Sequence, residues 1–135
     1  MARTNFSYNG TVINESPTII DTAGADITSG PFTALAYNDS GTLVTADAST
    51  VPFGITVAET EDKVPSGEDV TIQVKEIGAW KAGAAFARGC ALASDAKGCA
   101  IKATAGKFIL AFALDEATAA GQIVRVQIVK AGYAV

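Results

Sequence analysis

Residues 106–129, GKFILAFALDEATAAGQIVRVQIV, constrain the fold most, because they contain the longest apolar run of the chain. Successive side chains of a strand point to opposite faces, so an apolar run of seven residues at 108–114 puts apolar side chains on both faces. A strand of this kind is covered on two sides. The run therefore predicts the central strand of a sheet.

A turn and a second strand follow in the same stretch. Asp115 is placed to cap a short helical turn from Glu116 to Ala120, and Gly121 is placed to end it. Residues 123–129 then alternate between inward apolar and outward polar side chains, as in a half-buried strand. The inward residues are Val124, Val126 and Ile128, and the outward ones are Arg125 and Gln127.

The rest of the chain predicts an all-β fold, either a compact β-barrel or a β-sandwich. Short apolar segments recur at intervals of about 8 to 12 residues, each followed by a turn sequence, which is typical of these folds. The predicted strands are 32–38, 43–46, 53–58, 70–77, 90–94 and 99–103. Residues 80–89 fit a helical turn or a loop equally well, and residues 59–69 a solvated loop. No internal repeat of the solenoid kind is expected.

At 135 residues the chain is expected to form one domain, over residues 26–135, preceded by an extended N-terminal arm, residues 1–25. The first twenty residues are polar, and their apolar side chains are isolated, so the arm is expected to become ordered on a partner. The alternative is an edge strand of the domain, at residues 11–14 or 18–21. The candidate partner-binding residues of the arm are Phe6, Tyr8, Val12, Ile13 and Ile19.

The charge disfavours nucleic acid as a partner, because a net charge of −4 without a basic cluster is repelled by phosphate. No apolar stretch approaches the roughly 20 residues of a membrane span, and the N-terminus has no secretory signal. We expect a protein made soluble in the cytoplasm. Charged residues are only 18% of the chain, which suggests that another protein covers part of its surface.

The side chains of common active sites are scarce. The chain has no His and two Cys, so it offers no plausible zinc ligand set, no base for a Ser or Cys nucleophile, and no expected cofactor. Cys90 and Cys99 lie in a predicted hairpin that puts Ser94 opposite Cys99, too far from Cys90 for a disulfide. We expect two half-buried free thiols.

Two features leave alternatives open. Trp80 fits a partner-binding hot spot, but it also fits a lid over the core, which the sequence favours. An enzyme or a small-ligand-binding β-barrel is much less expected, since adjacent acids such as Asp115 and Glu116 are both solvated in a turn. A deep pocket lined by Asp115, Glu59 or Trp80 would distinguish that class.

Several segments resemble the capsid decoration, or head cement, proteins of tailed bacteriophages. They are VPFGITVAET, SGEDVTIQV, GAWKAGAAFARGCALASDAKGCAI and FILAFALDEATAAGQIVRVQIV, spread over residues 51–129. The last is the most specific, since an alanine-rich segment of this form next to a β-rich domain recurs in that family. The whole resemblance runs from about Gly30 to Val129, about three-quarters of the chain, and it does not extend to the arm.

The resemblance implies a structural virion protein that does no chemistry. Such proteins bind the outside of the assembled head between major capsid proteins, commonly as homotrimers at threefold or quasi-threefold sites, and stabilise the shell. It implies a place on the capsid exterior after assembly in the host cytoplasm. From the Thr and Val content of residues 1–20 and their lack of a core, we expect this arm to add a strand to a capsid protein or to lie across it. The alternative in the same class is a head-fibre or tail protein.

Overall fold

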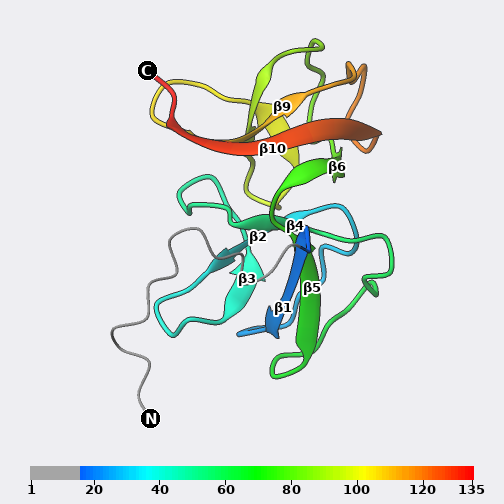
Figure 1. Cartoon of the computed structure of the whole chain (residues 1–135), viewed down its shortest axis with the longest axis vertical. Coiled ribbons are helices and arrows are strands. Elements are labelled where there is room, and N and C mark those ends of the chain that lie inside the picture. Colours follow the sequence, from blue (N-terminus) through cyan, green and yellow to red (C-terminus); the bar gives the residue numbers. More distant parts are fainter. Residues whose placement is uncertain (1–15) are drawn as a thin grey trace.

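A computed structural model describes residues 16–135, and within that range the chain forms strands and loops without a helix (Figure 1). The ten strands make two antiparallel five-stranded sheets that pack against each other. This confirms the predicted all-β fold.

The first sheet has the strand order β1-β5-β4-β2-β3. Its strands are β1 (Thr18–Thr22), β2 (Ala34–Tyr37), β3 (Leu43–Thr45), β4 (Gly54–Thr56) and β5 (Asp69–Gln73). β1 is an edge strand, paired with β5 from Thr18 opposite Gln73 to Thr22 opposite Asp69. Residues 18–21 were expected either to belong to an arm that becomes ordered on a partner or to form an edge strand, and in the structure they form the edge strand. The first sheet thus begins before residue 26, the expected start of the domain.

The second sheet has the strand order β6-β10-β9-β7-β8. Its strands are β6 (Glu76–Lys81), β7 (Ala91–Ser94), β8 (Ala100–Lys102), β9 (Phe108–Ala113) and β10 (Ile123–Tyr133). β9 is the middle strand, as the apolar run predicts, but it is not covered on both sides, because Phe112 is 37% exposed. β7 and β8 form the predicted hairpin, although Ser94 lies opposite Ala100 rather than Cys99. β10 continues beyond the predicted end at residue 129 to Tyr133, through an irregular register after Ile128.

The predicted helical turn from Glu116 to Ala120 is wrong. The backbone of Ala117 exchanges two hydrogen bonds of 3.0 Å with that of Phe86, which commits it to a β-bridge. Asp115 is not a helix cap. Its carboxylate accepts hydrogen bonds from the backbone and the guanidinium of Arg125 instead. These long-range partners outweigh the local capping preference.

The strand predicted at 70–77 is two strands that belong to different sheets, β5 and β6. The break lies at Glu76, which has a φ of 71°. The side-chain amide of Gln73 donates hydrogen bonds of 2.9 Å to the carbonyls of Lys75 and Ile77, and thereby holds the bend. Alternating apolarity continues through this bend, so the sequence pattern alone does not reveal it.

The two sheets are copies of one unit. Adding five to each strand number of the first sheet order gives the second order. Each sheet also closes on itself by a parallel bridge, Ala23 to Leu43 in the first and Ala82 to Ala100 in the second. We refer to residues 18–75 as the N-terminal unit and to residues 76–135 as the C-terminal unit.

Equivalent hydrogen bonds confirm this correspondence. Gly24 donates to Leu43 as Gly83 donates to Ala100, and Gly67 donates to Ala23 as Gly121 donates to Ala82. The sequence carries the repeat too, in AGADI against AGAAF and in GEDVTIQV against GQIVRVQI. The offset between equivalent residues falls from 59 at Ala23 to 54 at Gly67 because the loops differ in length, so a search for a fixed period misses the repeat.

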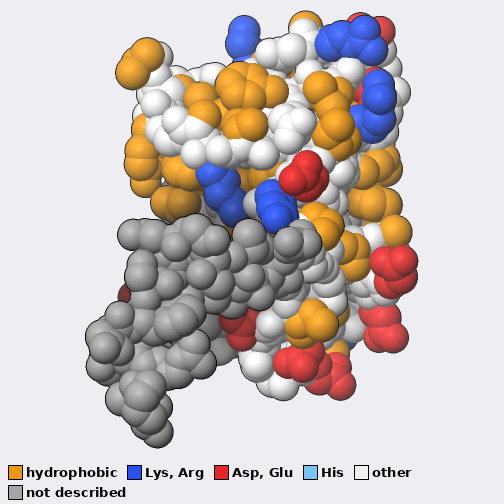
Figure 2. Space-filling view, in the orientation of Figure 1, with side chains coloured by type: hydrophobic (Ala, Val, Ile, Leu, Met, Phe, Trp, Pro, Cys, Tyr) orange, Lys and Arg blue, Asp and Glu red, His pale blue; other side chains and the backbone are white. Residues whose placement is uncertain are grey.

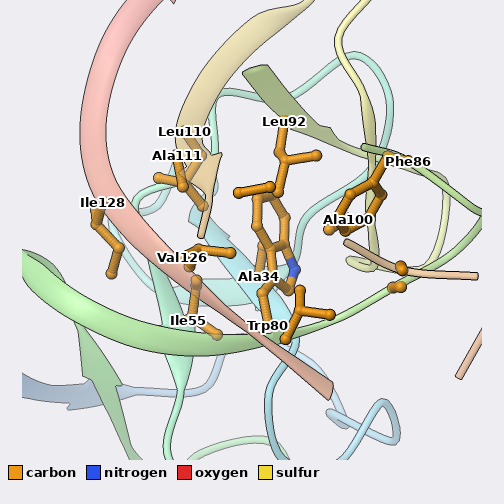
Figure 3. Close-up of a cluster of buried hydrophobic side chains, with 14 of the residues drawn as sticks. Ala34, Ile55, Trp80, Phe86, Leu92, Ala100, Leu110, Ala111, Val126 and Ile128 are labelled. Atoms are coloured by element: carbon orange, nitrogen blue, oxygen red, sulfur yellow. The ribbon is translucent and has the colours of Figure 1, made fainter. Parts of the chain in front are cut away.

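The core consists of two clusters of small and branched side chains. The first lies inside the N-terminal unit and includes Leu35, Leu43 and Ile72. The second fills the C-terminal unit around Trp80, which is 0% exposed. It also includes four residues of the N-terminal unit, which seal the end of the C-terminal unit: Ala34, Ala36, Ala46 and Ile55. Figure 3 shows the indole of Trp80 with Ala34, Ile55, Leu92 and Val126 around it.

Candidate partner-binding surface

The predicted partner-binding residues lie in different places. Phe6, Tyr8, Val12 and Ile13 lie outside the described residues. Ile19 is half-buried in β1, where it packs against the cluster of the N-terminal unit, while its neighbour Ile20 is 65% exposed.

Trp80 is a core residue. Its Nε1 donates a hydrogen bond of 2.8 Å to the Gly98 carbonyl, and its ring has no exposed surface with which a partner could make contact. Of the two interpretations of Trp80, the structure has the one in which it belongs to the core.

A row of side chains across four strands of the second sheet points away from the core. The strand registers put Ile77, Gln127, Phe112 and Ala91 side by side, from β6 to β7. Ile77 is 57% exposed and Phe112 is 37% exposed, and Ile123 and Val129 on β10 are exposed as well. Figure 2 shows hydrophobic side chains spread over this unit. Exposed apolar side chains gathered on one face, here interrupted by Gln127, are a feature of protein interfaces.

The N-terminal unit provides an internal control for this surface. The registers make Thr18 equivalent to Ile77, and Asp69 equivalent to Ile123, while Gln73 and Gln127 are identical. At these two positions the face is polar in the N-terminal unit and apolar in the C-terminal unit, whereas Phe112 and Ala91 have apolar equivalents, Ile55 and Ala34. Because the fold is the same, Ile77 and Ile123 are not required for folding, and binding explains them better. The sequence patterns did not single out Ile77 and Ile123, which an alignment of the two units would have found.

Charge also divides between the units. The N-terminal unit has nine acidic and two basic residues, a net charge of −7, and the C-terminal unit has four acidic and seven basic residues, a net charge of +3. Figure 2 shows most of the visible Lys and Arg over the C-terminal unit and most of the visible acids over the N-terminal unit. The overall charge of −4 hides this polarity.

An exposed ion cluster borders the apolar row. Arg125 donates hydrogen bonds from Nε and Nη2 to the two carboxylate oxygens of Asp115, at 3.0 and 2.8 Å, and the Arg88 guanidinium lies 3.9 Å from the same carboxylate. The hydrogen bonds from Arg125 lower the pKa of Asp115 to about 2. A carboxylate held in this way stays charged at neutral pH, so it is a poor proton donor or acceptor there.

Further features bear on the enzyme and metal alternatives. Among residues 16–135 no group of His, Cys, Asp and Glu could hold a metal ion. Asp115 and Glu116 line a hollow of about 510 Å³ together with Arg88. Glu59 and Trp80, the other two residues expected in the pocket of an enzyme, do not line this hollow. Cys90 and Cys99 are free and half-buried, and burial raises the pKa of both thiols. No helix of the described range could span a membrane.

The fold and the sequence are each similar to those of known phage proteins. In structure the chain is similar to the head fiber gp8.5 N base of bacteriophage phi29, with a TM-score of 0.64 and 19% identity. That alignment covers 87% of this chain and 98% of that one, and at this identity it concerns the fold. No curated protein matches the sequence. Residues 13–128 match the phage cement protein family, well over half of the chain. The chain therefore belongs to the phage cement protein family.

Proposed function

We propose that this protein is a structural component of the phage head that binds the outer surface of the assembled shell and stabilises it. The observation that carries the proposal is the match to the phage cement protein family over residues 13–128. The inert all-β fold and its apolar outer face agree with this role. Its place would be the exterior of the virion.

We propose the major capsid protein as its partner, bound by the arm and β1. β1 is an edge strand that carries Ile20, which is 65% exposed. An edge strand can accept a further strand, and the apolar residues of the arm would supply side-chain contacts. The family match begins at residue 13, so most of the arm lies outside the matched range.

The proposed role is non-enzymatic. Asp115 is bound to Arg125, and Trp80 is buried, so two of the three residues that would mark a catalytic pocket are committed to structure. Self-association as a homotrimer would increase the affinity for the head. Each further contact forms at an effective concentration on the order of millimolar, so a modest interface per chain suffices.

Binding to heads that lack the protein tests the proposal. The purified chain is mixed with such heads and sedimented, and the bound fraction is measured by gel densitometry. We expect saturable binding and a higher temperature of DNA release. A variant without residues 1–17 and the variant Ile20→Lys should bind more weakly, while Lys97→Gln, on the other unit, is the control. Absence of the wild-type chain from the pellet would contradict the proposed function.

A head-fibre base is the second candidate. The observation that favours it is the fold similarity to the head fiber gp8.5 N base, of which the alignment covers 98%. A base of this kind carries a projecting domain, whereas a cement protein need not. Electron cryo-microscopy of the virion would distinguish the two by the presence of projecting density above this chain.

A further inference from the structure

The contact between the two units has a defined geometry. Ala34, Ala36, Ala46 and Ile55 lie on the outer side of the first sheet, and we call them the Ala34 face. Leu35, between two of them on β2, points instead into the cluster of its own unit. All four residues of the face are at most 1% exposed, because the C-terminal unit covers them.

The C-terminal unit sits on this face through its β7-β8 hairpin, residues 95–99, which we call the Gly98 hairpin. The Ala34 backbone donates a hydrogen bond of 2.8 Å to the Gly98 carbonyl. A Cβ added to Gly98 would lie 2.8 Å from the Ala34 carbonyl oxygen, so the two backbones are in direct contact.

The C-terminal unit has an equivalent face. The repeat aligns Ala91, Ala93, Ala103 and Phe112 with Ala34, Ala36, Ala46 and Ile55, so three alanines recur and Ile is replaced by Phe. The backbone agrees, because Ala46 donates to Ala34 and Ala103 donates to Ala91. We call these four residues the Ala91 face.

The Ala91 face is partly open where the Ala34 face is covered: Ala91 and Ala103 are half-buried and Phe112 is exposed, although Ala93 is 2% exposed. Phe112 is 37% exposed, whereas its equivalent Ile55 is 1% exposed. A hollow of about 360 Å³ lies beside the face, lined by residues that include Arg88, Ala91, Lys102 and Ala103. No segment of residues 16–135 covers Phe112 as the C-terminal unit covers Ile55.

The N-terminal unit has the matching hairpin, residues 38–42, which we call the Gly41 hairpin. Asn38 Oδ1 accepts hydrogen bonds from the backbones of Ser40 and Thr42, as Asp95 Oδ1 does from Lys97 and Cys99. Gly41 has a φ of 77° and Gly98 one of 78°. The two turns have the same form, but among residues 16–135 a Cβ at Gly41 would meet no atom within 4 Å. No part of the chain that the structure describes covers the tip of this hairpin.

We propose that the Gly41 hairpin of one copy docks on the Ala91 face of a second copy, and thereby repeats between chains the contact that joins the two units within a chain. Charge supports this choice of partner, because the hairpin carries Asp39 and the hollow carries Arg88 and Lys102. The units as a whole, at −7 and +3, attract each other in the same orientation.

The contact is heterologous, since it joins two different surfaces. Such contacts generate closed rings or open chains, according to the rotation between neighbours. A closed ring of three copies would be the homotrimer of the proposed function. The inference rests on that proposed function only for the number of copies, and not for the contact itself.

Sedimentation velocity of the purified chain, without heads, tests the contact. We expect wild type to associate reversibly and less strongly as salt rises. Ala91→Lys puts a charge into the apolar contact and should raise the dissociation constant about tenfold or more. Val51→Lys, the matched change on an exposed residue of the other unit, should leave it unchanged. A wild-type chain that stays monomeric at its highest soluble concentration, or equal effects of the two changes, would overturn the proposal.

A mixing experiment tests the heterologous geometry. Asp39→Lys alters only the hairpin, at an exposed turn residue where unfolding is not expected, and should also weaken self-association about tenfold. A91K keeps an intact hairpin and D39K an intact face, so equal amounts of the two can form one good contact. We expect the mixture to form dimers where each variant alone is monomeric. A monomeric mixture would refute the pairing, and because heads are absent, this result is independent of capsid binding.

Discussion

Gly98 and Gly41 show how one residue type serves two purposes at equivalent positions. Both have a left-handed backbone, in which a Cβ is strained, but only Gly98 lies against another backbone, that of Ala34. We expect Gly41→Ala to lower the free energy of unfolding by about 1 kcal/mol, the cost of the conformation alone. Gly98→Ala should lower it by about 2 to 4 kcal/mol, since the clash adds to that cost.

Urea unfolding followed by Trp80 fluorescence would measure both variants, at a concentration low enough to keep the chain monomeric. Gly41→Ala serves as the matched control for the turn. Equal losses in the two variants would mean that the units are not in close contact at Gly98.

Asp115 is predicted to control acid stability at the border of the apolar row. Its pKa is about 2, below the ordinary 3.8, because Arg125 binds the charged form. A lowered pKa stabilises the fold above the ordinary value, and this contribution disappears as the pH falls from about 4 to about 2. NMR titration should give a midpoint near 2 in wild type and one closer to 3.8 in Arg125→Gln. An unchanged midpoint in that variant would contradict the assigned cause.

At the scale of elements, Lys130 links the units. Its Nζ donates a hydrogen bond of 3.0 Å to the Val74 carbonyl and lies 4.3 Å from the centre of the Phe53 ring. Burial lowers its pKa. We expect Lys130→Gln to cost about 1 to 2 kcal/mol of unfolding free energy, from the lost charged hydrogen bond and the lost cation–π contact. Lys97→Gln, in an exposed turn, should cost less than about 0.5 kcal/mol when measured by the same urea titration.

Strands of clear periodicity were predictable from the sequence. β9 and the first part of β10 follow from the apolar run and from the alternation after Gly121, and the β7-β8 hairpin from its turn residues. The failures have long-range causes. Ala117 is held by Phe86, 31 residues earlier, and the break at Glu76 is held by a side chain of the preceding strand. Local patterns do not contain these partners.

The candidate surface was predictable only in part. The arm residues stay predictions, and Trp80, the aromatic that sequence reasoning singled out, is buried. Ile77 and Phe112 escaped notice because an apolar residue on a strand normally points to the core, and only the register shows that these two point outward. Alignment of the two units singles out Ile77, whose equivalent Thr18 is polar, but not Phe112, whose equivalent Ile55 is apolar.

At the scale of the whole molecule, the two units should unfold together, because residues of both form one cluster around Trp80. Ile55→Ala removes a side chain of the N-terminal unit from that cluster and should cost about 2 to 5 kcal/mol. Ile20→Ala, exposed on the same unit, should cost less than about 0.5 kcal/mol. In calorimetry the Ile55→Ala variant should keep a single transition at lower temperature. Two separate transitions would show that the units are independent.

The doubled unit also bears on ancestry. A gene for one such unit, whose product paired with itself hairpin to face, would yield this chain after a single duplication in tandem. Fusion would then have turned an association that depends on concentration into one that does not. The Gly41 hairpin and the Ala91 face would then have kept the ancestral ability to pair with a separate molecule.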